Sequence, residues 1–548
     1  MLPLDAYPRP QLKRDSYLCL NGPWEFAVIR DSEPPKQYPD SILVPYPPES
    51  EASGICRRII AGETMHYRRT FALPEGFIKD RVLLHFGAVD QTCSVMLNGT
   101  LLGSHEGGYL PFSFDITEHL KSGENVLTVK AFDPLDHTYP WGKQKHKNGG
   151  MWYTPFSGIW QTVWLESVPD PYITGLKITP SLTSVRLELS DNAPVSLETE
   201  LEIETPFETL HWSFFGNVVD VPIPNPVLWT PEHPHLYPMT IRRDKDTVHS
   251  YFALRTISVE TVDKYSRILL NGKPYFFHGL LDQGYWKAGI CLPPDNEGYE
   301  KDIRYAKSLG FNTLRKHIRI EPLPFYETCD RLGMIVFQDC VNNGTYHFFR
   351  DTILPTIGIQ KLDDRNFRKK DSGTKVFKKT MLQTVRHLFN CPCIVYWTIF
   401  NEGWGQFQSD AMYALLKSSD ETRIVDSTSG WFWQKESDVD SYHVYFRAFR
   451  QKAGKRPLVL SEFGGYAYSA KGKQYGYRFF KTREAYRKAI EDLYRMQIIP
   501  AVKTGLCAAI YTQISDVEEE QNGIMTYDRT EQKLLSRDML KIADRLKI

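Results

Sequence analysis

Two apolar runs in this 548-residue chain each end in a glutamate. Residues 393–400 precede Asn401 and Glu402, and residues 457–460 precede Ser461 and Glu462. Continuous β-branched and aromatic residues are typical of a strand covered on both faces, as in a parallel sheet or barrel. In a (β/α)8 barrel the C-terminal ends of the strands form the rim that carries the catalytic side chains. Both glutamates are therefore candidate catalytic carboxylates at such a rim.

Two carboxylates at one rim are compatible with more than one chemistry. They could bind a divalent metal or a cationic ligand through their oxygens. They could also cleave a glycosidic bond, and the distance between them would then decide the mechanism. Retaining glycosidases hold the two carboxyl groups about 5 to 5.5 Å apart, whereas inverting enzymes leave room for a water between them. Taken alone, the run that ends in Glu402 also fits a buried strand followed by a turn.

The second half of the chain has the pattern needed to bring these glutamates together. After residue 262, helical stripes alternate with short apolar strands; the stripes are Tyr299, Ile303, Ala306 and Leu309, and Tyr486, Ile490, Leu493 and Met496. Eight strands are expected to begin near Tyr275, Thr313, Met334, Ile394, Arg423, Ser441, Pro457 and Gly505. Eight β/α units in residues 263–548 predict a TIM barrel in which Glu402 follows strand four and Glu462 follows strand seven. The polar stretch 340–373 is expected to be an active-site loop.

The first half of the chain has the pattern of two β-sandwiches. Residues 1–170 hold short strands broken by turn residues, with Asn98-Gly99 as a hairpin signal, and predict a jelly roll. Residues 171–262 repeat the pattern at the size of an immunoglobulin-like β-sandwich. The predicted fold is therefore multidomain, with a jelly roll, an immunoglobulin-like sandwich and a catalytic (β/α)8 barrel.

Composition limits the class of partner. Lys plus Arg and Asp plus Glu both number 66 and the pI is about 7.2, so no overall charge favours nucleic acid or an anionic membrane. Nine cysteines without paired spacing indicate reduced thiols, and the N-terminus lacks a signal-peptide pattern. We therefore expect a cytoplasmic protein with a small or neutral partner, and a homo-oligomer is possible.

Several motifs together resemble glycoside hydrolase family 2, which includes β-galactosidases, β-glucuronidases and β-mannosidases. Tyr67-Arg68-Arg69-Thr70-Phe71 and the segment from Gly149 to Trp160 resemble its sugar-binding domain. Asn401-Glu402 resembles its acid/base motif, and Ser461-Glu462-Phe463-Gly464 resembles its nucleophile motif. The resemblance implies a retaining exo-β-glycosidase in which Glu462 is the nucleophile, Glu402 is the acid/base and Asn401 binds the sugar 2-hydroxyl.

The resemblance implies roles for three further side chains. Arg315, in Asn312-Thr313-Leu314-Arg315-Lys316-His317, would support the nucleophile, although a structural ion pair is the alternative. His317 stands one residue before the family histidine, so it is either a site residue or a core residue. Tyr445 falls where the family has a tyrosine that donates to the nucleophile, and Tyr442 is the alternative if the register differs.

Three departures from the family pattern concern the strand ends. The first strand ends in Asp282 and Gln283, which are expected to contact sugar hydroxyls by an altered pattern. The third ends in Gln338-Asp339-Cys340, without the Glu and His that hold magnesium in large β-galactosidases, so no metal or cofactor is required. The eighth ends in Tyr511-Thr512-Gln513 without the usual tryptophan platform, which Trp404 or Trp431 could replace.

A fourth departure concerns the sugar. β-Glucuronidases grip the uronate with Asn-x-Lys before Gly-Ile, and this chain has Glu520-Gln521-Asn522 before Gly523-Ile524. A glutamate would repel a carboxylate, unless Lys471 or Lys473 supplies the positive charge. We therefore expect a neutral terminal β-sugar, with a β-galactoside first. A β-glucuronidase, β-mannosidase or arabinosidase, a transglycosidase and a non-catalytic carbohydrate-binding protein are the alternatives.

Overall fold

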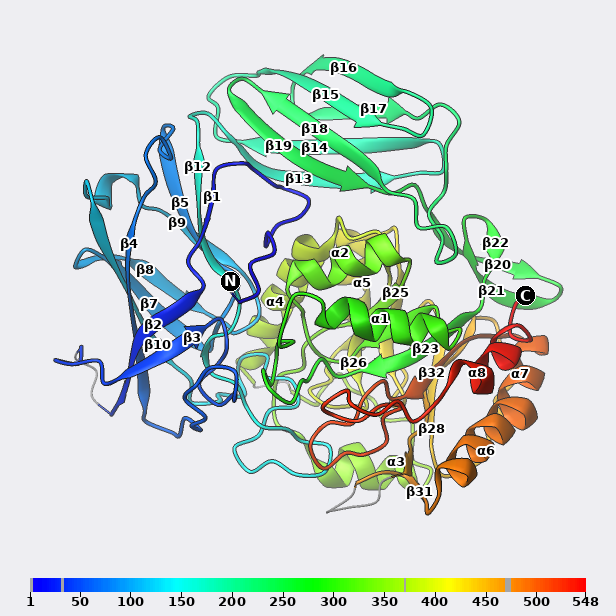
Figure 1. The fold of residues 1–548 in the computed structure, drawn as a ribbon. Helices are drawn as coiled ribbons and strands as arrows, with labels where there is room; N and C mark the ends of the chain where they lie inside the picture. Colours follow the sequence, from blue (N-terminus) through cyan, green and yellow to red (C-terminus); the bar gives the residue numbers. More distant parts are fainter. Residues whose placement is uncertain (1–2, 31–33, 369–370, 469–474) are drawn as a thin grey trace.

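The computed structural model describes residues 3–30, 34–368, 371–468 and 475–548. Two β-sandwiches and a barrel make up the chain (Figure 1), with the first sandwich at the left, the second at the top and the barrel at the lower right. The predicted fold class is confirmed. Among the described residues, no helix has the length and apolar character that crossing a bilayer requires.

The first sandwich packs a six-stranded sheet against a four-stranded sheet. The larger sheet has the order β3 (Asp40–Val44), β2 (Gly22–Ile29), β4 (Thr64–Ala72), β10 (Glu124–Phe132), β7 (Thr92–Leu97) and β8 (Thr100–Glu106). The smaller sheet has the order β1 (Tyr17–Cys19), β12 (Val163–Val168), β5 (Arg81–Phe86) and β9 (Phe112–Asp115), and β6 (Val89–Asp90) pairs with β11 (Gly158–Ile159). Asn98 and Gly99 join β7 to β8 at φ of 53° and 85°, as a type I′ hairpin turn requires, so that predicted hairpin is confirmed.

The second sandwich and a small sheet lead into the barrel. The sandwich packs β13 (Ile173–Pro180), β14 (Ser184–Asp191) and β17 (Val218–Pro222) against β16 (Thr209–Phe215), β15 (Glu198–Glu204), β18 (Tyr237–Arg243) and β19 (Asp246–Phe252). The small sheet consists of β20 (Ile257–Val262), β21 (Tyr265–Leu270) and β22 (Lys273–Pro274). The predicted boundary after residue 262 therefore falls at the tip of the β20–β21 hairpin.

Eight parallel strands form the barrel. They are β23 (Phe277–Asp282), β24 (Thr313–Lys316), β25 (Ile335–Asp339), β26 (Ile394–Asn401), β27 (Ile424–Ser429), β28 (Asp440–Val444), β29 (Leu458–Gly464) and β32 (Leu506–Thr512). The order is β27-β26-β25-β24-β23-β32-β29-β28, and the hydroxyls of Ser429 and Ser441, on the two end strands, lie 3.3 Å apart. The barrel is therefore nearly closed. Every strand begins within two residues of its predicted start, and the largest difference is Phe277 against Tyr275.

The helices depart from a regular barrel in two ways. They are α1 (Gly298–Ser308), α2 (Leu323–Leu332), α3 (Leu354–Thr356), α4 (Gly373–Leu388), α5 (Ser409–Ser419), α6 (Arg483–Leu493), α7 (Ile499–Lys503) and α8 (Ser536–Ala543). No helix follows β27 or β28 in the described segments 430–439 and 445–457, because these short connections lack a helical apolar stripe. Eight complete β/α units were therefore an incorrect prediction.

The predicted apolar stripe of α6 does not extend to Met496. After α6 the chain forms a π-helical turn, Tyr494–Ile498, which buries Tyr494 and Ile498 and leaves Met496 68 % exposed. A π-turn adds a residue to the turn and so rotates the apolar face. The polar stretch 340–373 similarly contains a π-turn, Phe349–Ile353, and the short helix α3.

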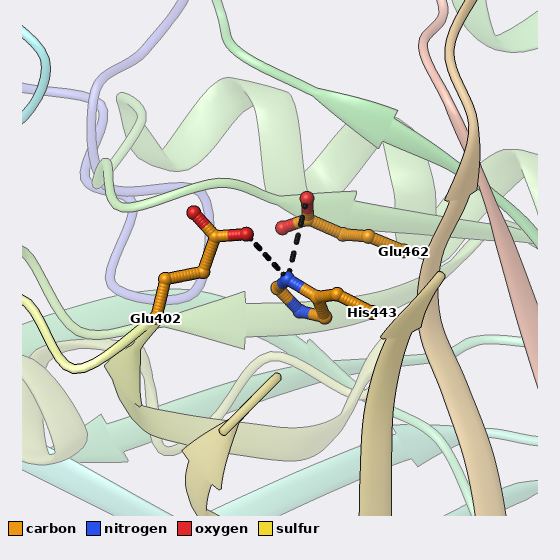
Figure 2. A group of neighbouring side chains, drawn as sticks. All are labelled: Glu402, His443 and Glu462. Atoms are coloured by element: carbon orange, nitrogen blue, oxygen red, sulfur yellow. Dashed lines mark hydrogen bonds and ion pairs between the residues drawn. The ribbon is translucent and has the colours of Figure 1, made fainter. Parts of the chain in front are cut away.

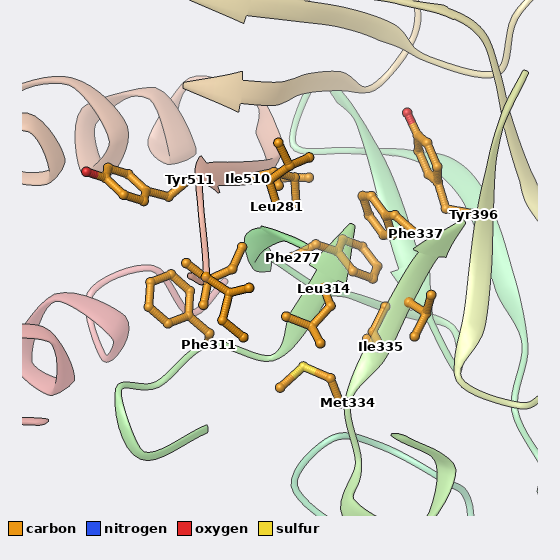
Figure 3. Close-up of a cluster of buried hydrophobic side chains, with 14 of the residues drawn as sticks. Phe277, Leu281, Phe311, Leu314, Met334, Ile335, Phe337, Tyr396, Ile510 and Tyr511 are labelled. Carbon is orange, nitrogen blue, oxygen red and sulfur yellow. The ribbon is translucent and has the colours of Figure 1, made fainter. Parts of the chain in front are cut away.

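The barrel interior is filled by side chains from neighbouring strands, so the rim alone is available for chemistry. Phe277, Leu281, Phe337 and Tyr396 belong to this buried cluster (Figure 3), and the rings of Phe337 and Tyr396 stack at 4.2 Å. Layers of large apolar side chains are the usual content of a TIM barrel. The continuous apolar run before Glu402 is therefore a strand buried on both faces, as its sequence predicts.

Candidate active site

Glu402 and Glu462 face each other across the barrel rim, and His443 lies between them (Figure 2). His443 Nδ1 is 2.7 Å from Glu402 Oε1 and 3.6 Å from Glu462 Oε2. One carboxylate oxygen of each glutamate and the imidazole nitrogen all lie within 4.8 Å of one another. Two charges at that separation repel by about 3 kcal/mol at an effective dielectric constant of about 20. A hydrogen-bond donor between them offsets part of that repulsion.

The backbone presents Glu402 at a turn directly after β26. Glu402 has a φ of 55°, in the left-handed region that few residues other than glycine adopt. The next residue, Gly403, is also left-handed, and a Cβ there would lie 2.4 Å from the Phe432 ring. Non-glycine residues in this conformation are concentrated at functional sites. The turn leaves the Glu402 side chain 20 % exposed, whereas that of Glu462 is 6 % exposed.

Arg315, on β24, connects the nucleophile candidate to its neighbours. Its Nη1 donates to Glu462 Oε1 at 3.1 Å, and its Nη2 donates to Asn401 Oδ1 at 2.8 Å. Because the guanidinium occupies the Asn401 oxygen, the amide nitrogen of Asn401 is left to donate into the site. These contacts bring Arg315 and Asn401 together beside Glu462.

A second carboxylate, Asp339 at the end of β25, holds Arg315 and His317 in position. Asp339 Oδ2 lies 3.0 Å from His317 Nδ1, which is itself 3.8 Å from Glu462 Oε1. Burial favours the neutral acid, but the charge of Arg315 and the hydrogen bond from His317 lower the pKa of Asp339 to about 2. His317 therefore lies beside the carboxylate pair, with burial lowering its pKa so that the neutral imidazole is favoured.

Tyr445 contacts Glu462, as the resemblance implied. Its hydroxyl donates to Glu462 Oε2 and lies 3.0 Å from Thr512 Oγ1. Burial and the charge of Glu462 raise the pKa of Tyr445, which keeps the phenol protonated as a donor. The ring stacks on Tyr477 at 3.8 Å, whereas Tyr442 packs against Trp433 instead. Tyr445 and not Tyr442 is therefore the tyrosine at Glu462.

These surroundings favour the ionised form of Glu462. Burial alone would raise its pKa, but electrostatic interactions with His443, Arg315, His317 and Lys143 lower it to about 2. An ionised carboxylate that is buried and fixed by two donors is suited to attack an electrophilic carbon. Lys143 comes from the first sandwich, so that domain adds charge to the barrel rim.

Asp282 does not join the carboxylate pair, which corrects its predicted role in binding sugar. Its Oδ2 accepts from Lys316 Nζ at 2.7 Å and its Oδ1 accepts from the Gly284 backbone at 2.8 Å. The reason is that successive side chains of a strand point to opposite faces of the sheet. Arg315 points to the site, so the next residue, Lys316, points away from it. Asp282 pairs in register with Lys316 and therefore points away as well. Gln283 is 3 % exposed, and its Nε2 has no hydrogen-bond partner among the residues with described positions. Its role in sugar binding stays a prediction.

Trp404 is not an open platform, which corrects a second expectation. Its ring is 3 % exposed because Trp141 and Trp152 of the first sandwich and Tyr346 pack against it at 4.9, 5.2 and 6.1 Å. We call these four residues the aromatic cluster. Trp431 is placed differently, with its ring 5.7 Å from that of His443. Its buried indole nitrogen has no partner within the described part of the chain, so Trp431 can still donate to a ligand.

Glu520 lies in a polar network that joins the barrel to the first sandwich. Its Oε2 accepts from the Tyr153 hydroxyl, and its Oε1 accepts from Asn522 Nδ2 at 3.0 Å. Asn522 in turn accepts from Gln513 Nε2 at 2.7 Å. Lys471 and Lys473, the alternative cations for a uronate, lie outside the described residues.

Sequence reasoning missed His443, Asp339 and Lys143. His443 could have been found from strand alternation, because it precedes Tyr445 by two residues and so shares its face. Asp339 is an acid at the end of a buried barrel strand, the same signal that identified the two glutamates. Lys143 gave no local signal, because its position depends on the docking of two domains.

Among the described residues, one group has a spacing that could also bind a metal ion. It consists of Glu402, His443 and Glu462. In the arrangement present, His443 Nδ1 is hydrogen-bonded to Glu402, and Glu462 is bound by Arg315 and Tyr445. Cationic donors around a carboxylate reduce its attraction for a further cation. The donor set is therefore better suited to acid and nucleophile chemistry than to metal binding.

The chain is similar in sequence or fold to several known proteins. The β-galactosidase of Thermoanaerobacter pseudethanolicus is 26 % identical over 442 residues, which cover 74 % of this chain and 54 % of that relative. The chain thus spans about half the length of that relative. A β-glucuronidase of an uncultured Clostridium species has the same fold, with a TM-score of 0.75, 19 % identity and coverage of 98 % and 99 % of the two chains. The β-galacturonidase of Eisenbergiella tayi gives a TM-score of 0.70, 20 % identity and coverage of 98 % and 96 %.

Family models match almost the whole chain in the expected order. The sugar binding domain of glycosyl hydrolases family 2 matches residues 18–169, and a second model of that family matches residues 172–255. The TIM barrel domain of the family matches residues 260–539, which include every barrel strand. With its two opposed glutamates at the rim of that barrel, the chain belongs to glycosyl hydrolases family 2.

Proposed function

We propose that this protein is a retaining exo-β-glycosidase that acts by double displacement. The observation that carries the proposal is the distance within 4.8 Å between carboxylate oxygens of Glu402 and Glu462. Retaining enzymes need this close spacing because one carboxylate attacks the sugar directly, whereas inverting enzymes need space for a water. The asymmetry of the two environments supports the assignment of the two roles.

In the first step Glu462 is the nucleophile and Glu402 is the acid. Glu462 attacks the anomeric carbon, the glycosidic C–O bond breaks, and the proton of Glu402 passes to the departing oxygen. Arg315 and Tyr445 hold Glu462 ionised and aimed, while Asn401 donates to the sugar 2-hydroxyl. In the second step Glu402 takes a proton from water, the water oxygen bonds to the anomeric carbon and the ester to Glu462 breaks.

For the sugar itself we propose a neutral terminal β-hexoside, with a β-galactoside first. Support comes from Glu520, a buried carboxylate in the segment Glu520-Gln521-Asn522 that stands where β-glucuronidases have the uronate-binding Asn-x-Lys. An acceptor that already binds Tyr153 and Asn522 offers no attraction to a second carboxylate. The named β-galactosidase relative is consistent with this choice.

A β-uronide is the second candidate, and Lys143 is the observation that favours it. The ammonium contributes positive potential at Glu462 and at His317. The Lys143 ammonium has no ion pair or hydrogen bond among the described residues, and it lies 5.8 Å from the centre of the Tyr153 ring. A free ammonium at a sugar site can bind a carboxylate. The fold neighbours named above include enzymes for both glucuronides and galacturonides.

A panel of nitrophenyl glycosides tests the function and the sugar together. We expect turnover of the β-galactoside, and Glu462→Ala should lose turnover of every substrate but regain it with added azide or formate. Turnover of a uronide that falls at least tenfold in Lys143→Gln, while galactoside turnover is unchanged, would instead establish the second candidate. Binding without turnover or labelling of Glu462 by a fluorosugar would indicate a carbohydrate-binding protein, and transfer to an added sugar acceptor in preference to water would indicate a transglycosidase.

Composition supports two further proposals about the whole protein. Nine free cysteines fit a reducing, cytoplasmic compartment, and a closed homodimer is the commonest assembly of oligomers. Light scattering at several concentrations tests the second proposal.

A further inference from the structure

His443 is a buried imidazole that joins the acid/base candidate to the nucleophile candidate, and neither the family resemblance nor the comparisons gave it a role. It lies on β28, where the pairing with β29 shifts between Tyr442 and His443. Its side chain has no exposed surface. A Cβ at Gly430 would lie 2.9 Å from His443 Nδ1, so the glycine admits the ring at this position.

The neighbours of the two ring nitrogens of His443 decide which of them donate. Nε2 lies 3.3 Å from Arg315 Nη1 and 3.0 Å from Ser429 Oγ. The Ser429 hydroxyl donates its proton to Ser461 Oγ at 2.9 Å, so the Ser429 oxygen is left to accept from Nε2. Nδ1 faces the carboxyl groups of Glu402 and Glu462, and an ionised carboxylate can only accept a hydrogen bond, so Nδ1 carries the proton of this contact.

The Nδ1 proton then has a single strong acceptor. Glu402 Oε1 lies 2.7 Å away, within hydrogen-bond distance, whereas Glu462 Oε2 at 3.6 Å is beyond it. Among the residues placed in the structure, the carboxyl group of Glu402 forms one hydrogen bond, which is the contact with His443. Oε2 of Glu402 is therefore free to carry the acidic proton.

We infer that His443 is a positioning residue for the acid/base: its Nδ1–H donates to Oε1 of Glu402, which reserves Oε2 for proton transfer with the glycosidic oxygen. This inference rests on the proposed function and names a residue through which that function works. A carboxyl group on a glutamate can rotate about its last torsion, and that torsion has broad minima. A fixed donor on one oxygen removes this freedom, which places the proton where the leaving oxygen departs.

The same hydrogen bond assists the second step. When Glu462 becomes a neutral ester, its charge no longer competes for the donor between the two glutamates. The Nδ1–H then stabilises Glu402 as the carboxylate that must accept a proton from water at Oε2. Other titratable or charged groups that act on His443 or Glu402 are Asp426, Arg315, Tyr346, Tyr445, Tyr475 and Tyr477.

The test compares substrates that differ in how much acid assistance they need. A dinitrophenyl glycoside loses its leaving group without a proton, whereas a phenyl or alkyl glycoside of the same sugar needs one. In His443→Ala we expect kcat/KM to fall tenfold or more for the poor leaving group and less than threefold for the good one, because acid catalysis is worth about 10²–10⁴-fold. An equal loss for both substrates would show a structural role and overturn the inference.

A matched pair of amides tests the position of the donor. His443→Asn places an amide nitrogen near the native Nδ1, whereas His443→Gln places it near Nε2, facing Arg315. We expect Asn to recover most of the lost activity on the poor leaving group and Gln to recover little. Equal activity of the two variants would contradict the inference. If His443→Ala does not fold, as judged by its thermal transition, this pair decides the question.

A double variant separates this inference from the proposed function. His443→Ala should cause no further loss with the poor leaving group when added to Glu402→Ala, because His443 acts through that carboxylate. A further tenfold loss would show that it acts elsewhere. If wild type turns over no glycoside, or Glu402→Ala shows no dependence on the leaving group, the proposed function has failed instead.

Discussion

Arg315 and Asp339 form a two-bond ion pair with both side chains almost wholly buried. Arg315 Nε donates to Asp339 Oδ1 and Nη2 donates to Oδ2, each at 3.0 Å, and each side chain is 1 % exposed. The pairing fixes the plane of the guanidinium, so its remaining donors are directed at Glu462 and Asn401. Asp339 thus orients the nucleophile candidate without touching it.

Removal of the Arg315 charge should shift the acidic limb of activity. The pKa of Glu462 is about 2 although burial opposes ionisation, and Arg315 is one of the charges responsible. Without that charge the pKa rises, so a higher pH is needed to form the attacking carboxylate. For Arg315→Met we expect the acidic limb of kcat/KM to move up by at least one pH unit, measured between pH 3 and 8. Arg255→Met, at a buried arginine that binds the Pro392 and Ile394 carbonyls, should leave the limb in place.

The buried ion pairs should also make the fold sensitive to acid. Glu462 and Asp339 have folded pKa values of about 2 against ordinary values of 4.5 and 3.8. Their stabilisation is fully present above the ordinary values and is lost as the pH falls toward 2. We expect Tm to drop between pH 5 and pH 3, and to drop less steeply in Asp339→Asn. Asp363→Asn, which removes the surface pair with Arg365, is the control and should leave the slope unchanged.

Tyr445→Phe should slow the reaction while the fold is retained. The change deletes only the hydroxyl that donates to Glu462, and the ring can still stack on Tyr477. We expect kcat to fall about 10- to 100-fold, in the range for loss of one hydrogen bond to a charged group. The control is Tyr442→Phe, at a tyrosine three residues before Tyr445 whose ring packs on Trp433, and its kcat should match wild type. Equal losses in the two variants would mean that Tyr445 has no special role.

Trp141→Ala should damage stability and activity together. Trp141 is 1 % exposed and contacts Trp404, and its indole nitrogen donates to the Gly344 carbonyl at 3.2 Å. Loss of a buried tryptophan costs about 3–5 kcal/mol. We expect a lower midpoint in urea unfolding and a lower kcat/KM, because the aromatic cluster supports the turn that bears Glu402. Trp212→Ala, at a residue 37 % exposed on the second sandwich, should affect neither.

The sequence predicted those features that depend on local pattern. The starts of the barrel strands followed from apolar runs, and Glu402 and Glu462 followed from the carboxylates at their ends. Features that depend on a change of helical period were not predictable in the same way. The π-turn at Tyr494–Ile498 rotates the apolar face of the helix, so Met496 is exposed although the regular spacing predicted that it would be buried. The outward direction of Asp282 depends on its pairing with Lys316, which the sequence does not display.

The contact between Tyr153 and Glu520 spans 367 residues and joins the first sandwich to the last part of the barrel. A ribosome completes the sandwich long before β32 and Glu520 are synthesised. The catalytic pocket can therefore take its final shape only after almost the entire polypeptide has emerged. Proteolytic separation of the sandwich from the barrel should leave two fragments that are inactive apart and regain turnover only when they reassociate.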